Sequence, residues 1–353
     1  MNGKVVVDLK ILIHNLQVTQ NRLKEGVKTL AVIKDNAYGH GIIEVAKTLE
    51  QHVFGFCVAR VDEGVLLRKA GITAPILVFE IPDPQKVNAY PKYNLMATVA
   101  DISTFDTLAE GTKYHLNFDT GMHRIGLYTS HLEDIKLAIA KRDDCKTTGI
   151  YTHFFKADDP GNPEVKQQLK RFNAVRSEFP SEWITHTANT GAIFHYADLN
   201  LQFDAVRPGV CLYGYGAGDK VIDELRPLME IKSHLVQVKQ LYAGDTVSYG
   251  GKWTAKTNGF LGIVPMGYSA GIPRLLSNRI LVRIGENLYP QVGIISMDYL
   301  QVFLGADKIP VGQEVILLGS SAQDAKQWAD FTGSIAYEIT TQINPSLKRE
   351  FIH

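Results

Sequence analysis

The run Thr29-Leu-Ala-Val-Ile-Lys34 is apolar and β-branched up to a final lysine, and a polar segment that ends in Gly39-His-Gly41 follows it. This order predicts a buried strand and then a loop. Seven further runs of this kind follow, separated by longer stretches with apolar residues at helical spacing. The expected strands cover residues 29–34, 53–59, 75–80, 95–99, 114–119, 148–154, 183–189 and 206–213.

Short strands that alternate with helices are typical of parallel β/α units, because a parallel connection needs a crossover. The expected helices cover residues 9–24, 42–49, 62–70, 102–110, 132–141 and 163–178. Eight units of this length favour an eight-stranded parallel β/α (TIM) barrel over an open doubly wound sheet. The fold class is therefore expected to be α/β.

The pattern changes after about residue 227, where apolar runs follow one another without helices between them. Turn signals such as Gly244-Asp245 separate these runs, which is typical of antiparallel strands. The runs cover residues 234–241, 259–265, 279–284, 291–305 and 315–319, and one short helix is expected near residues 325–331. We expect a barrel domain over residues 9–226 and a mainly antiparallel β domain over residues 227–353, with residues 1–8 packing with the second.

Composition excludes several classes of protein. The 353 residues carry 37 basic and 37 acidic side chains, which argues against nucleic acid as the principal partner. A content of 45% hydrophobic residues argues against disorder. The cysteines Cys57, Cys145 and Cys211 are too scattered for a disulfide framework or a zinc cluster. With no signal-peptide core and no apolar run of membrane-spanning length, we expect a cytoplasmic protein without a metal site or membrane contact.

Chemistry-bearing side chains stand at the ends of the expected strands, and in a barrel these ends share one mouth. Lys34 ends the first strand, where its amine can act as a nucleophile towards an aldehyde; alternatively, its stem follows the strand and its charge reaches water. Tyr38 can hold a phosphate or simply form part of a turn. The other strand ends supply Asp119, Arg124, His153, Asn189, Thr190 and Arg207. Each has an ordinary structural explanation alone, but together they favour a small anionic ligand.

These segments resemble the alanine racemases, which are pyridoxal-phosphate enzymes with a β/α barrel and a carboxyl-terminal β domain. The similar segments lie in order over nearly the whole chain: Ala31-Val-Ile-Lys-Asp-Asn-Ala-Tyr-Gly-His-Gly41, residues 68–78, Asp119-Thr-Gly-Met-His-Arg-Ile-Gly126, Thr152-His-Phe154, His186-Thr-Ala-Asn-Thr190, Arg207-Pro-Gly-Val-Cys-Leu-Tyr-Gly214, Ser248-Tyr-Gly250, Gly267-Tyr268, Ser296-Met-Asp298 and Ala336-Tyr-Glu-Ile339.

The resemblance implies a pair of acid/base groups. Racemisation removes an α-proton from one face of a planar carbon and delivers one to the other, so two groups must flank it. Lys34 would carry the cofactor as an aldimine and serve the D face, and Tyr249 would serve the L face. In the family this tyrosine reaches the active site of the partner subunit, which implies a homodimer with shared active sites. Without the resemblance, Tyr249 would be a strand tyrosine packed in a β interface.

The resemblance also assigns residues to pyridoxal 5'-phosphate and to the substrate. Arg207 would contact the pyridine nitrogen and leave it unprotonated, because a guanidinium keeps its proton at neutral pH. His153 would orient Arg207. The cofactor set is completed by Tyr38, Asn189, Thr190, Gly209, Val210 and Tyr337, most of them around the phosphate. Arg124 would lie near the substrate carboxylate, and the partner's Met297 and Asp298 would close over the substrate, while Tyr268 would line the approach.

Four positions depart from the family's pattern. Many members have a carbamylated lysine seven residues before the arginine, and here that position is Asn117, which cannot be carbamylated. Arg124 must then be held by the amide, by another carboxylate or by a bound anion such as chloride. Ile294 stands where an arginine is frequent, Asp35 where alanine is frequent, and His123 where a smaller or amide residue is frequent.

The function that the resemblance implies is the interconversion of L-alanine and D-alanine, which supplies D-alanine for peptidoglycan. One alternative is the same chemistry on a wider set of small amino acids, such as serine. A barrel decarboxylase of basic amino acids shares the lysine motif, but its pyridine partner is acidic, so Arg207 argues against it. A non-catalytic pyridoxal-phosphate carrier would lack the second domain and any counterpart of Tyr249.

Overall fold

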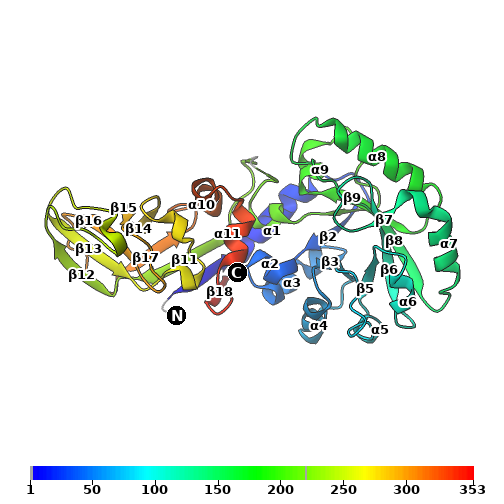
Figure 1. Ribbon diagram of the computed structural model, residues 1–353, viewed down its shortest axis with the longest axis horizontal. Helices are drawn as coiled ribbons and strands as arrows, with labels where there is room; N and C mark the ends of the chain where they lie inside the picture. Colours follow the sequence, from blue (N-terminus) through cyan, green and yellow to red (C-terminus); the bar gives the residue numbers. More distant parts are fainter. Residues whose placement is uncertain (1–2, 219–220) are drawn as a thin grey trace. The chain divides into compact units, whose positions relative to one another are not determined.

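The computed structural model describes residues 3–218 and 221–353, which fall into two compact units (Figure 1). The barrel unit comprises Ile13–Ala37 and Gly41–Leu225. The second unit joins the amino-terminal residues up to Leu12, the short segment Tyr38–His40, and Arg226–His353. The turn that follows Lys34 is therefore divided between the two units.

Eight parallel strands form a closed barrel in the first unit. Closure follows from the pairing of β10 with β2 and of β5 with β6. The barrel strands are β2 (Lys28–Val32), β3 (Gly55–Val58), β4 (Ile76–Val78), β5 (Met96–Val99), β6 (Lys113–Asp119), β8 (Lys146–Tyr151), β9 (Ile184–Asn189) and β10 (Ala205–Arg207). A two-residue strand, β7 (Leu127–Tyr128), adds to β6. The predicted fold class is confirmed.

Several predicted elements of the barrel unit are longer than the observed ones, and two of them differ most. The strand predicted over residues 206–213 ends at Arg207, because Pro208 has no N–H for the ladder, and η3 (Val210–Tyr213) follows as a 3-10 turn. The helix predicted over residues 102–110 is only α6 (Thr104–Thr107), since Leu108 is already extended.

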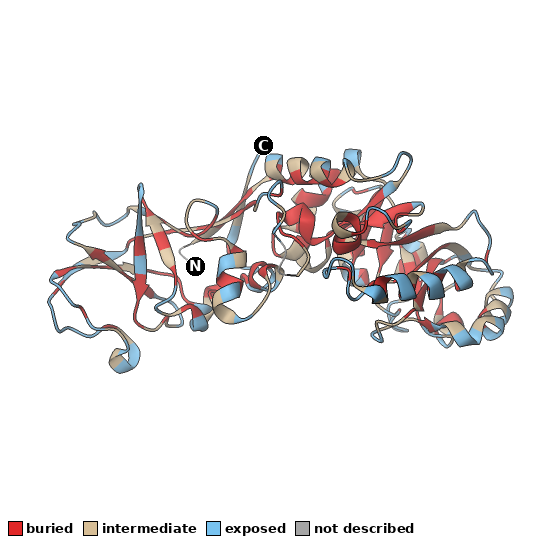
Figure 2. Cartoon of the chain, turned by 90° about the horizontal axis from the view of Figure 1, so that it is seen from above, coloured by how far each residue is buried: buried red, intermediate tan, exposed pale blue. Residues whose placement is uncertain are grey.

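Helices cover the connections between the barrel strands. In α3, Ile42, Val45, Ala46 and Leu49 recur at helical spacing and are all buried. The helices are α3 (Ile42–Leu49), η1 (Glu50–His52), α4 (Val61–Lys69), α5 (Ala89–Lys92), α6, η2 (Thr129–His131), α7 (Leu132–Ala140), α8 (Pro163–Arg176) and α9 (Thr190–His195). α1 (Leu9–Gln20) precedes the first barrel strand, and α2 (Lys34–Tyr38) is a left-handed turn. Figure 2 shows the barrel strands as buried.

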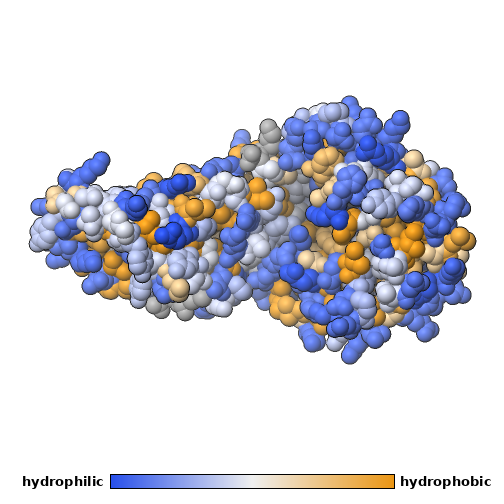
Figure 3. Space-filling view, in the orientation of Figure 1, coloured by the Kyte–Doolittle hydropathy of each residue, from blue (hydrophilic) through white to orange (hydrophobic). Residues whose placement is uncertain are grey.

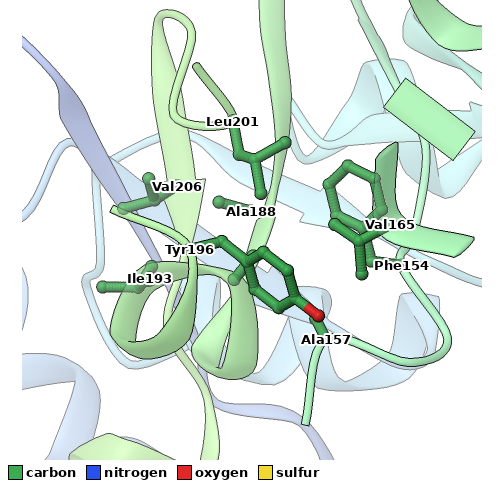
Figure 4. Close-up of a cluster of buried hydrophobic side chains, with 9 residues drawn as sticks. Phe154, Ala157, Val165, Ala188, Ile193, Tyr196, Leu201 and Val206 are labelled. Carbon is green, nitrogen blue, oxygen red and sulfur yellow. The ribbon is translucent and has the colours of Figure 1, made fainter. Parts of the chain in front are cut away.

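One apolar cluster packs the loop after β8 against α8, α9 and the strands β9 and β10 (Figure 4). Its buried members are Phe154, Ala157, Val165, Ala188, Ala192, Ile193, Tyr196, Leu201 and Val206. Gly191 lies at the start of α9, where a Cβ atom would stand 2.5 Å from the carbonyl oxygen of Ala157. The cluster therefore fixes the loops that follow β8 and β9 at the carboxyl end of the barrel.

The second unit is a nine-stranded sheet in the order β12-β13-β16-β15-β14-β17-β11-β1-β18. All pairs are antiparallel except β1 with β18. The strands are β1 (Lys4–Asp8), β11 (Met229–His234), β12 (Gln237–Leu241), β13 (Gly259–Val264), β14 (Leu281–Ile284), β15 (Asn287–Val292), β16 (Leu300–Gly305), β17 (Glu314–Leu318) and β18 (Lys348–Ile352). Short helices complete the unit: η4 (Tyr249–Gly251), η5 (Tyr268–Ala270), η6 (Arg274–Leu276), α10 (Ala325–Thr332) and α11 (Ala336–Gln342).

The predicted mainly antiparallel domain is confirmed, with some differences in its elements. The run predicted over residues 291–305 is two strands joined by a loop over residues 293–299. The run at residues 234–241 is split between β11 and β12. β1, β18 and α11 were not predicted. Among the described residues, no helix is both long enough and apolar enough to cross a bilayer. In Figure 3, hydrophobic residues are interspersed with hydrophilic ones on the visible surface of each unit.

Candidate functional site

Lys34 lies just beyond β2, at the start of a left-handed turn. The four residues that follow it, Asp35, Asn36, Ala37 and Tyr38, have φ values of 53°, 55°, 54° and 52°. This conformation costs roughly 1–2 kcal/mol for each residue with a Cβ atom, so neighbouring groups must hold it. The Lys34 side chain is 37% exposed, with its Nζ 3.8 Å from the Asp35 carboxylate. The amine is thus accessible at the end of a buried strand.

Arg207 ends β10 and is the most deeply buried charge of the site, at 3% exposed. Its Nη1 donates to His186 Nδ1 at 2.6 Å and to the His186 carbonyl at 2.7 Å. Its Nη2 donates to the carbonyls of Thr152 at 2.7 Å and Thr187 at 3.2 Å. Among the described residues it has no carboxylate partner, and its Nε–H makes no hydrogen bond. Burial lowers the pKa of Arg207, yet a guanidinium keeps its proton near neutrality.

The charge of Arg207 fixes the tautomers of two buried imidazoles. Arg207 can only donate, so His186 Nδ1 must accept and the proton of a neutral His186 stands on Nε2. That N–H donates to His115 Nδ1 at 2.8 Å, which places the His115 proton on its own Nε2. Burial, and then the Arg207 charge, lower the pKa of His115 to about 3 and that of His186 well below its usual value. Tyr151 stacks on the His186 ring at 4.8 Å.

His153 follows β8 and also faces Arg207. The expected contact is long, 3.5 Å from Nδ1 to Arg207 Nη2, and His186 makes the shorter one. Because Nδ1 faces a donor, the His153 proton belongs on Nε2. The Nδ2 group of Asn189 lies 3.5 Å from Nε2, and it is also a donor. This Nδ2 group donates its shorter hydrogen bond to the Phe154 carbonyl at 3.0 Å. The Nε2–H of His153 is therefore available to a ligand.

Small polar groups follow β9 and β10. Asn189 caps α9 by accepting the N–H of Ala192 at 3.0 Å. The hydroxyl of Thr190 accepts the N–H of Gly209 at 3.2 Å. The N–H of Val210, at the start of η3, makes no hydrogen bond within residues 3–218 and 221–353. Hydroxyl and backbone N–H groups arranged in this way suit an anion such as a phosphate.

Arg124 lies in the exposed loop after β6 and forms no ion pair with a described residue. Asn117 is buried and donates to the carbonyl of Ile125 at 3.1 Å rather than meeting the arginine. Asp119 accepts the N–H groups of Gly121 and His123, so it shapes this loop. Of the three groups expected to hold Arg124, the structure shows neither the Asn117 amide nor a carboxylate of a described residue in contact with it.

Tyr249 belongs to the second unit and is 70% exposed. Its turn is fixed by Ser248, whose hydroxyl donates to the carbonyl of Ile294 at 2.6 Å. Tyr249 lines an open pocket of about 740 Å³, together with Val236, Gln237, Ser248, Ile263, Ser296, Tyr299 and Gln301. The pocket therefore joins the predicted tyrosine to the loop between β15 and β16.

That same loop carries Met297 and Asp298, both exposed. It is held against Tyr268 and Ser269, because their N–H groups donate to the carbonyls of Ser296 and Met297 at 3.1 and 3.0 Å. Asp298 also accepts the hydroxyl of Ser269 at 3.1 Å. The loop and the Tyr268 turn thus form one exposed structure in the second unit.

Tyr38 and Tyr337 also meet within the second unit, where their rings stand edge to face at 6.4 Å. In the barrel unit, the ends of four neighbouring strands, in the order β8, β9, β10 and β2, bring together His153, Asn189, Arg207 and Lys34. Sequence reasoning missed the role of His186, because a histidine inside a strand looks like any buried residue. Its signal was its position in β9, beside the strand that carries Arg207.

The barrel residues fit pyridoxal 5'-phosphate on three observations. Arg207 is a buried guanidinium with no carboxylate partner among the described residues, and it keeps its Nε–H for an acceptor such as a pyridine nitrogen. The free N–H of Val210 beside Thr190 suits the phosphate. Lys34 offers an accessible amine for the aldehyde. Each group is on a strand end or a tight turn, so the three are fixed by the fold.

Comparisons with known proteins identify a family that covers nearly the whole chain. Residues 7–217 match the family model described as alanine racemase, N-terminal domain, and residues 228–351 match alanine racemase, C-terminal domain. The alanine racemase of Carboxydothermus hydrogenoformans is 36% identical over 98% of both chains, and that of Haemophilus influenzae is 35% identical over 96% of this chain and 95% of the relative. Two solved structures are similar over 100% of this chain. They are alanine racemase from Clostridium difficile 630 (TM-score 0.93, 32% identity, 96% of that chain) and from Bacillus anthracis with bound L-Ala-P (TM-score 0.92, 30% identity, 95% of that chain).

Proposed function

The chain belongs to the alanine racemase family, and from this premise we propose that it interconverts L-alanine and D-alanine with pyridoxal 5'-phosphate as cofactor. The single observation that carries the proposal is Arg207, a buried guanidinium with a free Nε–H at the carboxyl end of the barrel. When bound, the cofactor draws electrons from the bond between the α-carbon and its hydrogen. A cationic donor at the pyridine nitrogen moderates that withdrawal, which favours reprotonation over side reactions.

The chain's own residues would hold the cofactor at three places. Lys34 Nζ would bond to its aldehyde carbon. Arg207, oriented by His186, would donate to the ring nitrogen. The phosphate would receive the N–H groups of Gly209 and Val210 and the hydroxyl of Thr190. Further candidates for the cofactor are the hydroxyls of Tyr38 and Tyr337, and the polar groups of His153 and Asn189.

Proton transfer would use two side chains. Lys34 Nζ would hold and move the proton on the D face of the α-carbon, and Tyr249 Oη would do so on the L face. Arg124 would pair with the substrate carboxylate, which agrees with its lack of a counter-ion among the described residues. The partner's Met297 and the partner's Asp298 would close over the substrate.

Tyr249 would act in the active site of a second copy of the chain. Exposure of 70% is unusual for a proton-transfer group, because such a group works best away from bulk water. Tyr268, Met297 and Tyr299 are also exposed near it. An exposed set of large apolar side chains around a pocket is typical of a surface that a partner covers. We therefore include a homodimer with shared sites in the proposal.

The test is chiral analysis of products after incubation with L-alanine or D-alanine and the cofactor. The expected result is an equal mixture from either enantiomer, and loss of the reaction in Lys34→Ala. A panel that includes L-serine decides between a narrow and a wider set of small substrates. Growth of a bacterium that requires D-alanine, after it receives this chain, would show that the product supplies peptidoglycan. Unchanged optical rotation with either alanine would refute the proposal.

A further inference from the structure

The left-handed turn after Lys34 is held by a carboxylate from another β/α unit. We propose that Glu63, in the first turn of α4, is a positioning residue that fixes this turn and so aims the Lys34 amine at the cofactor's aldehyde. The inference rests on the proposed function for the role of Lys34, but it concerns a residue that the cofactor does not touch.

Glu63 uses both carboxylate oxygens. Its Oε1 accepts the N–H of Asn36, the second residue of the turn, at 3.2 Å. Its Oε2 accepts the N–H groups of Ala59 and Arg60 at 2.9 and 3.2 Å. The side chain is half-buried between these partners. One carboxylate thus ties the turn after β2 to the segment between β3 and α4.

Helix capping explains only half of this arrangement. Glu63 is the third residue of α4, and its Oε2 caps the helix by accepting the N–H of Arg60, the residue before the first turn. That cap would be complete without Oε1. The bond from Oε1 to Asn36 reaches into another β/α unit, at the residue where φ is 55°. Asparagine tolerates this conformation better than most residues with a Cβ atom, but a run of four such residues is strained, so an external acceptor at its second residue stabilises the turn directly.

A second contact joins the same two segments. Arg60 Nη2 donates to the Asp35 carboxylate at 3.0 Å, and the other oxygen of Asp35 lies 3.8 Å from Lys34 Nζ. Asn36 also accepts the N–H of Ile42 through its side chain at 2.9 Å. Arg60 is 63% exposed, so its ion pair is weak, and the half-buried Glu63 carries the larger part of the restraint.

Two variants separate positioning from capping. In Glu63→Gln the amide oxygen can still accept from Ala59 and Arg60, as glutamine does in capping boxes, but its NH₂ group then faces the N–H of Asn36. Glu63→Asp keeps the charge but is one methylene too short to reach both segments. Glu50→Gln is the matched control. All the bonds of Glu50, to Thr73 and Ala74, go to one oxygen, which glutamine retains.

The first readout is hydrogen exchange of the full chain without cofactor. Both Glu63 variants should exchange the amides of residues 35–38 about tenfold faster, as expected for the loss of one hydrogen bond to a carboxylate, with the rest of α4 unchanged. The second readout is cofactor binding, followed by the absorbance of the covalent link to Lys34. In both Glu63 variants the dissociation constant of the cofactor should rise about tenfold, and in Glu50→Gln it should equal that of the wild type.

Relief of the backbone strain provides a rescue. Glycine adopts a φ of 54° without cost, so Ala37→Gly in the Glu63→Gln background should recover most of the lost cofactor affinity. Amide exchange rates and cofactor affinity equal to those of the wild type in either Glu63 variant would overturn the inference. Faster exchange throughout α4 as well as in the turn would also overturn it, because it would show that Glu63 acts only as a helix cap. If the wild-type chain formed no link to the cofactor, the proposed function itself would fail, and the exchange experiment would still decide the role of Glu63 in the turn.

Discussion

Mild acid should destabilise the barrel unit, because three imidazoles are buried in its site. His115, His153 and His186 have pKa values lowered first by burial and next by the Arg207 charge, to about 3 for His115 and well below the usual value for the others. In the folded chain His115 therefore stays neutral at pH 5, and the lowered pKa values of His153 and His186 favour their neutral forms in the same way. In the unfolded chain each takes up a proton below its ordinary pKa of 6.5.

The sign follows from proton linkage. The unfolded state binds more protons than the folded state below pH 6.5, so the free energy of unfolding falls as the pH falls from 6.5 towards about 3. Between pH 7 and pH 5 His115 alone removes about 2 kcal/mol, and His153 and His186 add to the loss in the same direction. This is a large fraction of a typical domain stability of about 5–15 kcal/mol.

The assay is urea unfolding at pH 7, 6 and 5, at fixed cofactor concentration. Trp183 reports on the barrel unit when Trp253 and Trp328, both in the second unit, are replaced by phenylalanine. His115→Gln should reduce the loss between pH 7 and pH 5 by about 2 kcal/mol, and replacement of the exposed His131 by glutamine should not change it. A stability at pH 5 within about 1 kcal/mol of that at pH 7 would refute the neutral, buried assignment of these side chains.

Three further predictions concern single groups. In Arg207→Lys, three N–H donors face the four protein acceptors of Arg207, so the free energy of unfolding should fall by about 1–3 kcal/mol and cofactor binding should weaken. A thermal unfolding experiment that gives wild-type stability would contradict the hydrogen-bond assignment. Gly191→Ala places a methyl group 2.5 Å from the Ala157 carbonyl oxygen, so the free energy of unfolding should fall by about 1–3 kcal/mol. An unchanged melting temperature would show that the loop containing Ala157 moves to accommodate the methyl group. Arg124 has no counter-ion among the described residues, so a bound chloride is the remaining group expected to hold it in place. Replacing chloride with a large organic anion should then raise KM for alanine, and a constant KM would argue against an anion beside Arg124.

The barrel and the position of Lys34 could be predicted from the sequence, because Lys34 ends an apolar run whose pattern identifies a parallel strand. The sequence predicts the strand that carries Arg207 over residues 206–213, and it ends at Arg207 instead. The conformation after Lys34 could not be predicted, since nothing in Asp-Asn-Ala-Tyr signals four positive φ angles in residues with Cβ atoms. The contact of Glu63 with Asn36 could not be predicted, because the two residues are remote in sequence and a glutamate at the third position of a helix is common. His186 was hidden for a similar reason, since its role depends on the neighbouring strand.

A mixture of two inactive variants distinguishes an active site shared between subunits from one formed within a single chain. Lys34→Ala and Tyr249→Phe chains, each unable to racemise alanine alone, are dissociated together and allowed to reassociate. If Tyr249 serves the Lys34 of a partner, each mixed dimer contains one site with both native residues, and the mixture should recover up to about a quarter of wild-type activity. If mixed dimers form and no activity returns, the two residues do not share a site across subunits and the account is contradicted.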